Sequence, residues 1–307
     1  MSATNREIAS QPAAWERALS LAHDVGGALV APGERVLAIG CGTSAFVAQC
    51  YAVLRERAGL GETDAGYASE LPAGRHYDRV VAITRSGTTT EVLEALRALP
   101  AKTRRVSVTA VAGQPVDRLV DERILLDFAD ESSVVQTRFP TTLLALARGA
   151  LGDDVGDLVR DGEVALAGTL PADPARYRHF VLLGTGWTVG LAHEGALKLR
   201  EVAQAWSESY PAMDYRHGPI AVAGPHSLVW MLGQLPDGLA ETVAAAGATV
   251  HTDKLDPLAQ LILVQRLALG LAAARGLDPD QPRHLTRSVV LTPDGSAPTS
   301  ASTRRAP

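Results

Sequence analysis

The second half of the chain holds three ionisable side chains at helical spacing. Glu194, Lys198 and Glu201 follow one another at intervals of four and three residues, so in a helix they share one face. Carboxylates and ammonium groups can carry protons in catalysis. The alternative is a solvated stripe of salt bridges, which most such stripes are. Against it, the predicted helix directly follows a Gly-x-Gly turn at 184–186, which brings its N-terminal turns near a ligand-binding edge.

A histidine that suits the same chemistry lies sixteen residues beyond Glu201. His217 stands in the run Tyr-Arg-His-Gly-Pro, where Gly218 and Pro219 pin the loop. Histidine changes its charge near neutral pH and often transfers protons. A lone loop histidine usually has no such role, so His217 by itself does not establish catalysis.

Two hydroxyl-rich loops in the first half have the composition of a phosphate site. Residues 40–44 read Gly-Cys-Gly-Thr-Ser and residues 84–90 read Thr-Arg-Ser-Gly-Thr-Thr-Thr, and each follows a predicted strand and precedes a predicted helix. The two loops therefore meet at the carboxyl edge of one parallel sheet. Helix N-termini there offer free N–H groups, the hydroxyls add donors, and Arg85 adds a cation.

The alternative is that Ser44, Ser86 and Thr88 are only helix N-caps, as serine and threonine often are. The second half of the chain argues against this, because its corresponding segment 232–238 reads Leu-Gly-Gln-Leu-Pro-Asp-Gly and has no hydroxyl. Neither loop continues into the Gly-Lys-Ser/Thr of a nucleotide-binding P-loop, which disfavours nucleotide hydrolysis. We therefore predict a phosphate site.

These motifs need a framework of parallel strands and helices, and the hydrophobic pattern supplies one. Strands are predicted at 35–40, 79–84, 106–111, 123–126, 179–183 and 227–232. Helices are predicted to begin near Ser44 and Thr88, to cover 141–149 and 257–275, and to run from the second Gly-x-Gly turn to about Trp206. Residues 36–44 and 181–188 both read as a buried strand that ends in Gly-x-Gly and opens a helix, which indicates a duplicated α/β unit.

The predicted fold class is α/β, with two doubly wound, flavodoxin-like domains, each a parallel sheet flanked by helices. We expect the first domain at 1–150, a linker with a crossing helix at 151–177 and the second domain at 178–292. Residues 293–307 are rich in Pro, Ser and Ala without periodicity, which predicts a disordered tail.

Composition narrows the function classes. A length of 307 residues suits two domains, and a net charge of -5 with 21% charged residues disfavours a nucleic-acid partner. Cys41 and Cys50 have neither disulfide nor zinc spacing, which favours a reducing compartment, and we expect neither a metal nor a cofactor. The N-terminus lacks the apolar core of a signal peptide, and no later run is expected to reach the length of a membrane span. We expect a cytoplasmic protein without a membrane partner.

The chain resembles a known family. Residues 183–201, with Arg-His-Gly-Pro at 216–219, are similar to the isomerase half of glucosamine-6-phosphate synthase, a member of the SIS (sugar isomerase) superfamily. The likeness continues in Glu7-Ile8 and Gln11-Pro12 at its opening, in Cys41-Gly-Thr-Ser44 and Ser86-Gly87 at its sugar-phosphate loops, and in 280–283 and Ser288-Val289 at its close. The resemblance implies two SIS domains and a homodimer with shared active sites.

The resemblance also implies roles for single residues. Glu201 would move a proton between C2 and C1 of a phosphorylated aminosugar, and His217 would assist ring opening from the neighbouring subunit. Lys198, which we count as catalytic, and Glu194 match as well, in orienting or structural roles. The residues implied to hold the sugar phosphate are Cys41, Gly42, Thr43, Ser44, Thr84, Arg85, Ser86, Thr88, Thr89, Val134, Gln136 and Arg287.

Three departures from the family limit the transfer. Gln136 stands where the family carries a serine. Arg287 replaces the lysine that forms a Schiff base with fructose 6-phosphate, and an always-protonated guanidinium cannot act as an amine nucleophile. The resemblance begins almost at Met1, so a glutaminase domain, and with it glutamine-dependent synthesis, is not expected of this chain alone.

Three functions remain open. The first is an isomerase or deaminase that converts glucosamine 6-phosphate into fructose 6-phosphate and ammonia. The second is a lyase or dehydratase of N-acetylglucosamine 6-phosphate. Glu201 would form an enediol by the same proton removal, and the C3 substituent would then leave, as in SIS-fold etherases. The third is a sugar-phosphate sensor without catalysis. The retention of Glu201 and His217 speaks against the sensor, as does the lack of a preceding DNA-binding domain.

Overall fold

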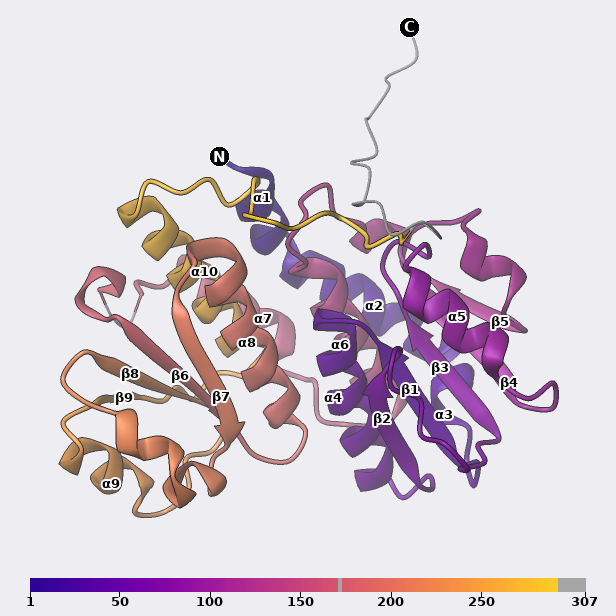
Figure 1. Cartoon of the computed structure of the whole chain (residues 1–307), viewed down its shortest axis with the longest axis horizontal. Helices are drawn as coiled ribbons and strands as arrows, with labels where there is room; N and C mark the ends of the chain where they lie inside the picture. Colours follow the sequence, from indigo (N-terminus) through magenta and orange to yellow (C-terminus); the bar gives the residue numbers. More distant parts are fainter. Residues whose placement is uncertain (171–172, 292–307) are drawn as a thin grey trace, which may run out of the picture.

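Two parallel β-sheets, each flanked by helices, organise the chain in a computed structural model that describes residues 1–170 and 173–291 (Figure 1). The first sheet has the order β2-β1-β3-β4-β5, formed by β1 (Val36–Gly40), β2 (Thr63–Tyr67), β3 (Arg79–Ile83), β4 (Arg104–Thr109) and β5 (Glu122–Leu125). The second has the order β7-β6-β8-β9, formed by β6 (His179–Gly184), β7 (Trp206–Pro211), β8 (Ser227–Leu232) and β9 (Thr249–His251). Every strand pair is parallel, which confirms the predicted fold class.

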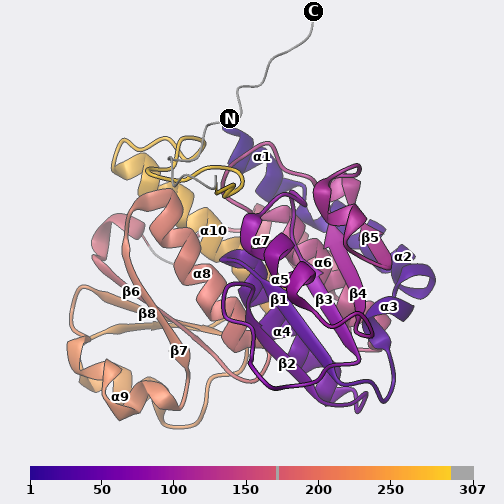
Figure 2. The ribbon, with the colours of Figure 1, turned by 45° about the vertical axis from the view of Figure 1, so that its right-hand side comes forward.

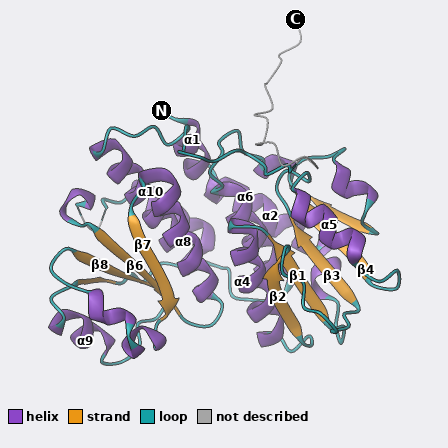
Figure 3. Cartoon of the chain, viewed as in Figure 1, coloured by secondary structure: helices purple, strands orange, loops and turns teal. Residues whose placement is uncertain are grey.

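Helices surround both sheets (Figure 3). They are α1 (Ala3–Ala9), α2 (Gln11–Val25), α3 (Gly27–Val30), α4 (Thr43–Arg57), α5 (Thr90–Ala98), α6 (Arg138–Ala150), α7 (Leu158–Ala167), α8 (Thr188–Ala203), α9 (Leu239–Ala245) and α10 (Pro257–Ala274). The described residues also form five 3₁₀ turns, η1 (Pro115–Arg118), η2 (Asp127–Ala129), η3 (Pro174–Arg176), η4 (Asp214–His217) and η5 (Pro219–Val222). Chain order in the first sheet reverses direction between β1 and β3, and ligands bind at such a switch point in doubly wound folds.

The predicted strands and helices are present, with boundaries that differ by up to three residues. The helix expected to reach Trp206 ends at Ala203, because Gln204 adopts a left-handed φ of 50° and Trp206 opens β7. The domain limits remain predictions. The helix α7 lies within the predicted linker, whereas residues 171–172 of that linker and nearly all of the predicted tail lie outside the described residues.

The two sheets are joined through helices α4 and α8, which pack against each other between them (Figure 1). Near the start of α8, Gly190 lies so close to α4 that a Cβ there would be 2.5 Å from the carbonyl oxygen of Phe46 and from Sγ of Cys50. Two turns later, Lys198 contacts Thr43 at the start of α4. The helices therefore run antiparallel, and the last turns of α8 reach the carboxyl edge of the first sheet.

Helix α10 corrects one expectation. It has 18 residues and a mean hydropathy of 1.5, so by length and composition it could cross a membrane, contrary to the prediction that no apolar run reaches this length. Of these residues 67% are buried inside the protein, where α10 packs against α7 and α8. Its apolar side chains are those of a core helix.

Candidate active site

The two hydroxyl-rich loops meet at the carboxyl edge of the first sheet, as predicted. Gly42 and Gly87 have φ values of 53° and 68°, which favour glycine, and a Cβ at Gly87 would lie 2.7 Å from the Cβ of Gln114. A cavity of about 30 Å³ opens between the loops, lined by Cys41, Ser44, Ile83, Thr84, Arg85, Ser86, Thr89, Val92, Gln136 and Arg287. This space holds about one water molecule. All these residues except Ile83 and Val92 belong to the predicted sugar-phosphate set.

The loop hydroxyls are not helix caps. The N-caps of α4 and α5 are Gly42 and Thr89, and neither makes a side-chain capping bond. The alternative role for Ser44, Ser86 and Thr88 is therefore wrong. Ser86 Oγ instead accepts from the N–H of Thr88 at 3.3 Å and from Thr88 Oγ1 at 3.0 Å.

The C-terminal segment 287–291 lies across the second loop. Ser86 Oγ donates to Ser288 Oγ at 3.1 Å, and Thr88 Oγ1 lies 2.8 Å from the same atom. The N–H of Thr90 donates to the carbonyl of Val289 at 3.2 Å. Sequence reasoning noted Ser288 only as part of the closing segment, since a contact over 200 residues has no local signal.

Arg85 is buried, and its guanidinium donates hydrogen bonds to backbone carbonyls. It donates to the carbonyls of Ser133 at 3.1 Å and of Arg287 at 3.0 Å, and it lies 3.8 Å from Oε2 of Glu131. Burial lowers the pKa of Arg85, and the carboxylate of Glu131 opposes that shift. The guanidinium thus joins three segments around the cavity, whereas we had predicted a cation facing the phosphate.

The loop after β5 brings Gln136 to the cavity. The Gln136 Oε1 atom is buried and has no hydrogen-bond partner among the residues that the structure describes. The carbonyl of Val134 accepts a long bond, 3.5 Å, from Arg85. Buried Glu131, which sequence reasoning missed, accepts from the N–H groups of Thr137 at 2.6 Å and Arg138 at 2.7 Å.

The three ionisable groups of α8 lie on one helix face and are largely buried. Lys198 is 0% exposed; its Nζ donates to Oε2 of Glu201 at 2.5 Å and to Oγ1 of Thr43 at 3.1 Å. Glu194, 1% exposed, has Oε1 3.3 Å from the same Nζ, within ion-pair range but outside hydrogen-bond geometry. Glu201 is partly open to solvent. This is a buried charge cluster rather than a solvated stripe.

The direction of α8 differs from our expectation. We expected its N-terminal turns to approach the ligand edge, but its C-terminal turns carry Lys198 and Glu201 to the loop of Thr43. The antiparallel packing on α4 causes this. The Lys198–Glu201 pair thereby reaches the hydroxyl-rich edge of the other domain.

Burial changes the proton affinity of this cluster. Desolvation raises the pKa of Glu194 to about 7, while Lys198 opposes the rise. Burial alone would lower the pKa of Lys198, but Glu194 and Glu201 outweigh it and the net pKa is raised. Burial also raises the pKa of Cys41 to about 11, so this thiol is not a ready nucleophile.

His217 lies apart from these groups. It is exposed in η4, after β7, on the second domain. Within the part of the chain that the structure describes, no hydrogen bond or ion pair joins it to Glu201 or Lys198. A single chain therefore does not bring His217 into contact with the buried cluster.

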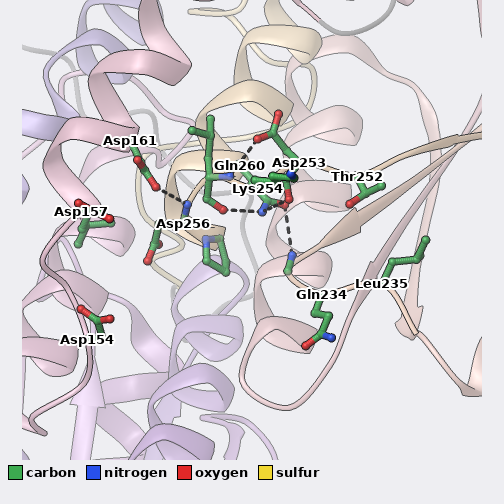
Figure 4. Close-up of a pocket in the computed structure, with 14 residues that line it drawn as sticks. Asp154, Asp157, Asp161, Gln234, Leu235, Thr252, Asp253, Lys254, Asp256 and Gln260 are labelled. Atoms are coloured by element: carbon green, nitrogen blue, oxygen red, sulfur yellow. Dashed lines mark hydrogen bonds between the residues drawn. The ribbon is translucent and has the colours of Figure 1, made fainter. Parts of the chain in front are cut away.

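A larger cavity, of about 570 Å³, opens at the carboxyl edge of the second sheet (Figure 4). Its carboxylates are Asp154, Asp157, Asp161, Asp253 and Asp256, against a single ammonium, that of Lys254. Asp256 pairs with Arg148 at 2.8 Å, and Asp161 accepts from the N–H of Asp256 at 2.8 Å. So many negative charges repel a phosphate. The phosphate site is therefore better placed at the smaller, hydroxyl-lined cavity of the first sheet.

Fold and site together define a two-domain protein of the SIS class. No protein-family model matches the chain. The glucosamine-6-phosphate deaminase structure from Thermotoga maritima superposes with a TM-score of 0.82 at 26% identity, covering 94% of this chain and 100% of that one. The C-terminal domain of glucosamine-fructose-6-phosphate aminotransferase from Francisella tularensis has a TM-score of 0.74 at 21% identity, covers 92% of this chain and 98% of that one, and supports the fold alone.

In sequence, the chain resembles the isomerase half of a larger enzyme, as predicted. It is 32% identical over 263 residues to a glutamine–fructose-6-phosphate aminotransferase (isomerizing) of Pyrobaculum aerophilum, across 70% of this chain and 44% of that protein. The chain spans about half the length of the curated relatives it matches. It is an SIS-domain protein that resembles the isomerase half of this aminotransferase.

The raised pKa of Glu194 predicts how stability depends on pH. Its value of about 7, against an ordinary 4.5, means that the folded protein binds this proton more tightly than the unfolded chain does. The free energy of unfolding should therefore fall as pH rises through that window. Glu194→Gln removes the titrating group, so its stability relative to wild type should rise with pH.

Urea unfolding of both proteins between about pH 5 and pH 8 measures this difference. Exposed Glu163, on α7, supplies the control variant Glu163→Gln, whose difference from wild type should stay constant. A pH-independent difference for Glu194→Gln would contradict the assignment of a buried carboxyl with a raised pKa.

Proposed function

We propose that the chain is an enzyme that binds an aminosugar 6-phosphate, opens the sugar ring and removes the proton at C2, as an isomerase or deaminase. The observation that carries this proposal is the position of Glu201. Lys198 holds its carboxylate at 2.5 Å and contacts Thr43 of the hydroxyl-rich edge at 3.1 Å. The likeness to the Thermotoga maritima protein, named glucosamine-6-phosphate deaminase, supports an aminosugar substrate.

In the proposed site, the loops of the first sheet bind the phosphate and α8 supplies Glu201. The phosphate takes hydrogen bonds from the hydroxyls of Ser44, Ser86 and Thr89, and from N–H groups at the starts of α4 and α5. Thr84, Thr88 and the segment 41–43 complete these loops. The cavity beside them is too small for a sugar phosphate as it stands, so binding includes a shift of the segment that carries Arg287.

The proposed reaction transfers one proton through Glu201. In the open-chain aldehyde, the C2–H proton passes to the Glu201 carboxylate, the electron pair of that bond forms a C1–C2 double bond, and the carbonyl pair moves to O1, which takes a proton from water. Return of the first proton to C1, with loss of an N–H proton to water, leaves a hydroxyl on C1 and an imine at C2. Water then adds to C2, and ammonia leaves to give the 2-ketose 6-phosphate.

The arginine at position 287 is also compatible with a second reaction of the same intermediate, elimination of the C3 substituent. Its guanidinium pairs with Asp130 at 2.5 Å and supplies no amine nucleophile at the cavity. Without a lysine to form a Schiff base with a C2 ketone, the enolate formed by proton removal at C2 can instead expel the C3 substituent, which would make the protein a dehydratase of N-acetylglucosamine 6-phosphate. A non-catalytic sensor is disfavoured, because it would not need the buried Lys198–Glu201 pair.

The proposal includes a homodimer in the cytoplasm. His217 is exposed and lies apart from the buried cluster of its own chain, so a role in ring opening requires a second copy that presents His217 to Glu201. This arrangement gives two shared sites in each dimer.

An assay in deuterated water tests the reaction. Glucosamine 6-phosphate and N-acetylglucosamine 6-phosphate are incubated separately with the purified protein, and ammonia, ultraviolet absorbance and deuterium uptake at C1 or C2 are followed. Ammonia is expected from the first substrate, whereas an absorbing unsaturated product from the second would establish the dehydratase. Glu201→Gln removes the base and should lower turnover by about a hundredfold or more. Near-wild-type turnover in this variant would refute the mechanism.

Mixed dimers test the shared site. Glu201→Gln and His217→Ala proteins are each expected to be inactive, but a mixed dimer has one site with both native residues. After complete subunit exchange, activity should return to about a quarter of the wild-type value. If dimers shown to be mixed by mass spectrometry stay inactive, His217 does not act across the subunit boundary.

A further inference from the structure

Helix α1 carries a buried carboxylate outside the groups considered so far. Glu7 is 6% exposed, and its Oε1 accepts from the N–H of Ser132 at 2.6 Å, from Ser132 Oγ at 2.9 Å and from the N–H of Ser133 at 3.3 Å. Its Oε2 accepts from Ser133 Oγ. Both oxygens therefore hold one short stretch of the chain, 125 residues away in sequence.

Burying the Glu7 carboxylate costs desolvation free energy, which an apolar side chain at this position of α1 would not cost. Burying a charge is unfavourable unless hydrogen bonds replace its water, and no ion pair joins Glu7 to a cation in residues 1–170 and 173–291. Four donors meet the need, and hydrogen bonds to ionised groups are the strong ones. These bonds fix the geometry of the loop that begins at Ser132 and Ser133.

That loop leads directly to the cavity. Ser133, held by Glu7 on one side, accepts from Arg85 through its carbonyl at 3.1 Å on the other. Three residues later, Gln136 lines the cavity. The far end of the loop is held independently by Glu131, through the N–H of Thr137 at 2.6 Å. Glu7 thus fixes the end of the loop that Glu131 does not.

Helix α1 is itself tied to the C-terminal segment. Asp280 accepts from the N–H groups of Ala3 at 2.6 Å and Thr4 at 2.9 Å, and Figure 2 shows this segment passing beside α1. The same segment continues to Arg287 at the cavity. Helix α1 therefore contacts both the stretch that leads to Gln136 and the C-terminal segment that leads to Arg287.

We propose that Glu7 is a positioning residue for sugar recognition. It sets the stretch 132–136, and through it the Gln136 amide, whose buried Oε1 meets a hydroxyl or amino donor of the sugar. Glu7 does not touch the loops 40–44 and 84–90 that meet the phosphate. The inference rests on the proposed function, because it assumes that a sugar phosphate occupies this cavity.

Comparing two ligands distinguishes a role of Glu7 in sugar recognition from a general effect on stability. Calorimetry gives the Kd of glucosamine 6-phosphate and of inorganic phosphate for wild type, Glu7→Ala and Glu7→Gln. For Glu7→Ala, the sugar-phosphate Kd should rise at least about tenfold, as expected for the loss of bonds to a charged group, while the phosphate Kd stays within about twofold. Glu7→Gln keeps one acceptor oxygen and should recover part of the loss. Exposed Glu16, on α2, gives the control Glu16→Ala.

Ser133→Ala is the second variant if Glu7→Ala does not fold. It removes the hydroxyl that donates to Glu7 and to the carbonyl of Val135, and it leaves the N–H bonds of residues 132 and 133 to Glu7. The sugar-phosphate Kd should therefore rise severalfold and the phosphate Kd should not change. Equal changes for both ligands, or no change for either, would overturn the positioning role and leave the proposed function standing. Failure of the wild type to bind either ligand would overturn both.

Discussion

The buried ammonium of Lys198 is the interaction that joins the two domains into one site. It is 0% exposed and has three oxygen partners, in Glu194, Glu201 and Thr43. The loss of any partner would leave a charge less compensated in a low-dielectric interior, which is strongly unfavourable. Because Thr43 belongs to the first domain and Lys198 to the second, the cluster fixes the end of α8 against the start of α4. The absence of a side chain at Gly190 allows the close approach that this contact requires.

This antiparallel contact decides which sheet edge can serve as the site. The carboxyl edge of the first sheet receives Glu201 from the other domain and has the hydroxyls that suit a phosphate. The carboxyl edge of the second sheet holds a larger cavity, but its aspartates repel anions. The two halves share the strand-to-helix turn with Gly-x-Gly, but the second-half segment 232–238 lacks the hydroxyls that residues 84–90 have in the first half. Duplication thus supplied two similar edges with different chemistry.

Local patterns predicted the parts of the site that local sequence determines. The strands that end at Gly40 and Ile83 are apolar runs followed by glycine and hydroxyls, and the face of α8 follows from a spacing of four and three residues. The edge strands β2, β7 and β9 were not predicted, because their half-exposed residues lack an apolar run. Glu7 and Ser288 entered only through the family resemblance and Glu131 was given no role, since each acts through hydrogen bonds that depend on tertiary placement. The direction of α8 relative to the first sheet likewise depends on packing, which no periodicity records.

In the proposed site one ligand spans both domains, with its phosphate on the first-sheet loops and its C2 carbon at Glu201. The most direct measurement is a crystal structure of Glu201→Gln, which keeps the shape of the side chain but removes the base, in complex with glucosamine 6-phosphate. We expect the phosphate oxygens within hydrogen-bond distance of the Ser44 and Ser86 hydroxyls, and C2 facing the amide at position 201. A sugar phosphate bound in the aspartate-lined cavity of the second domain, or bound with C2 turned away from position 201, would contradict the account.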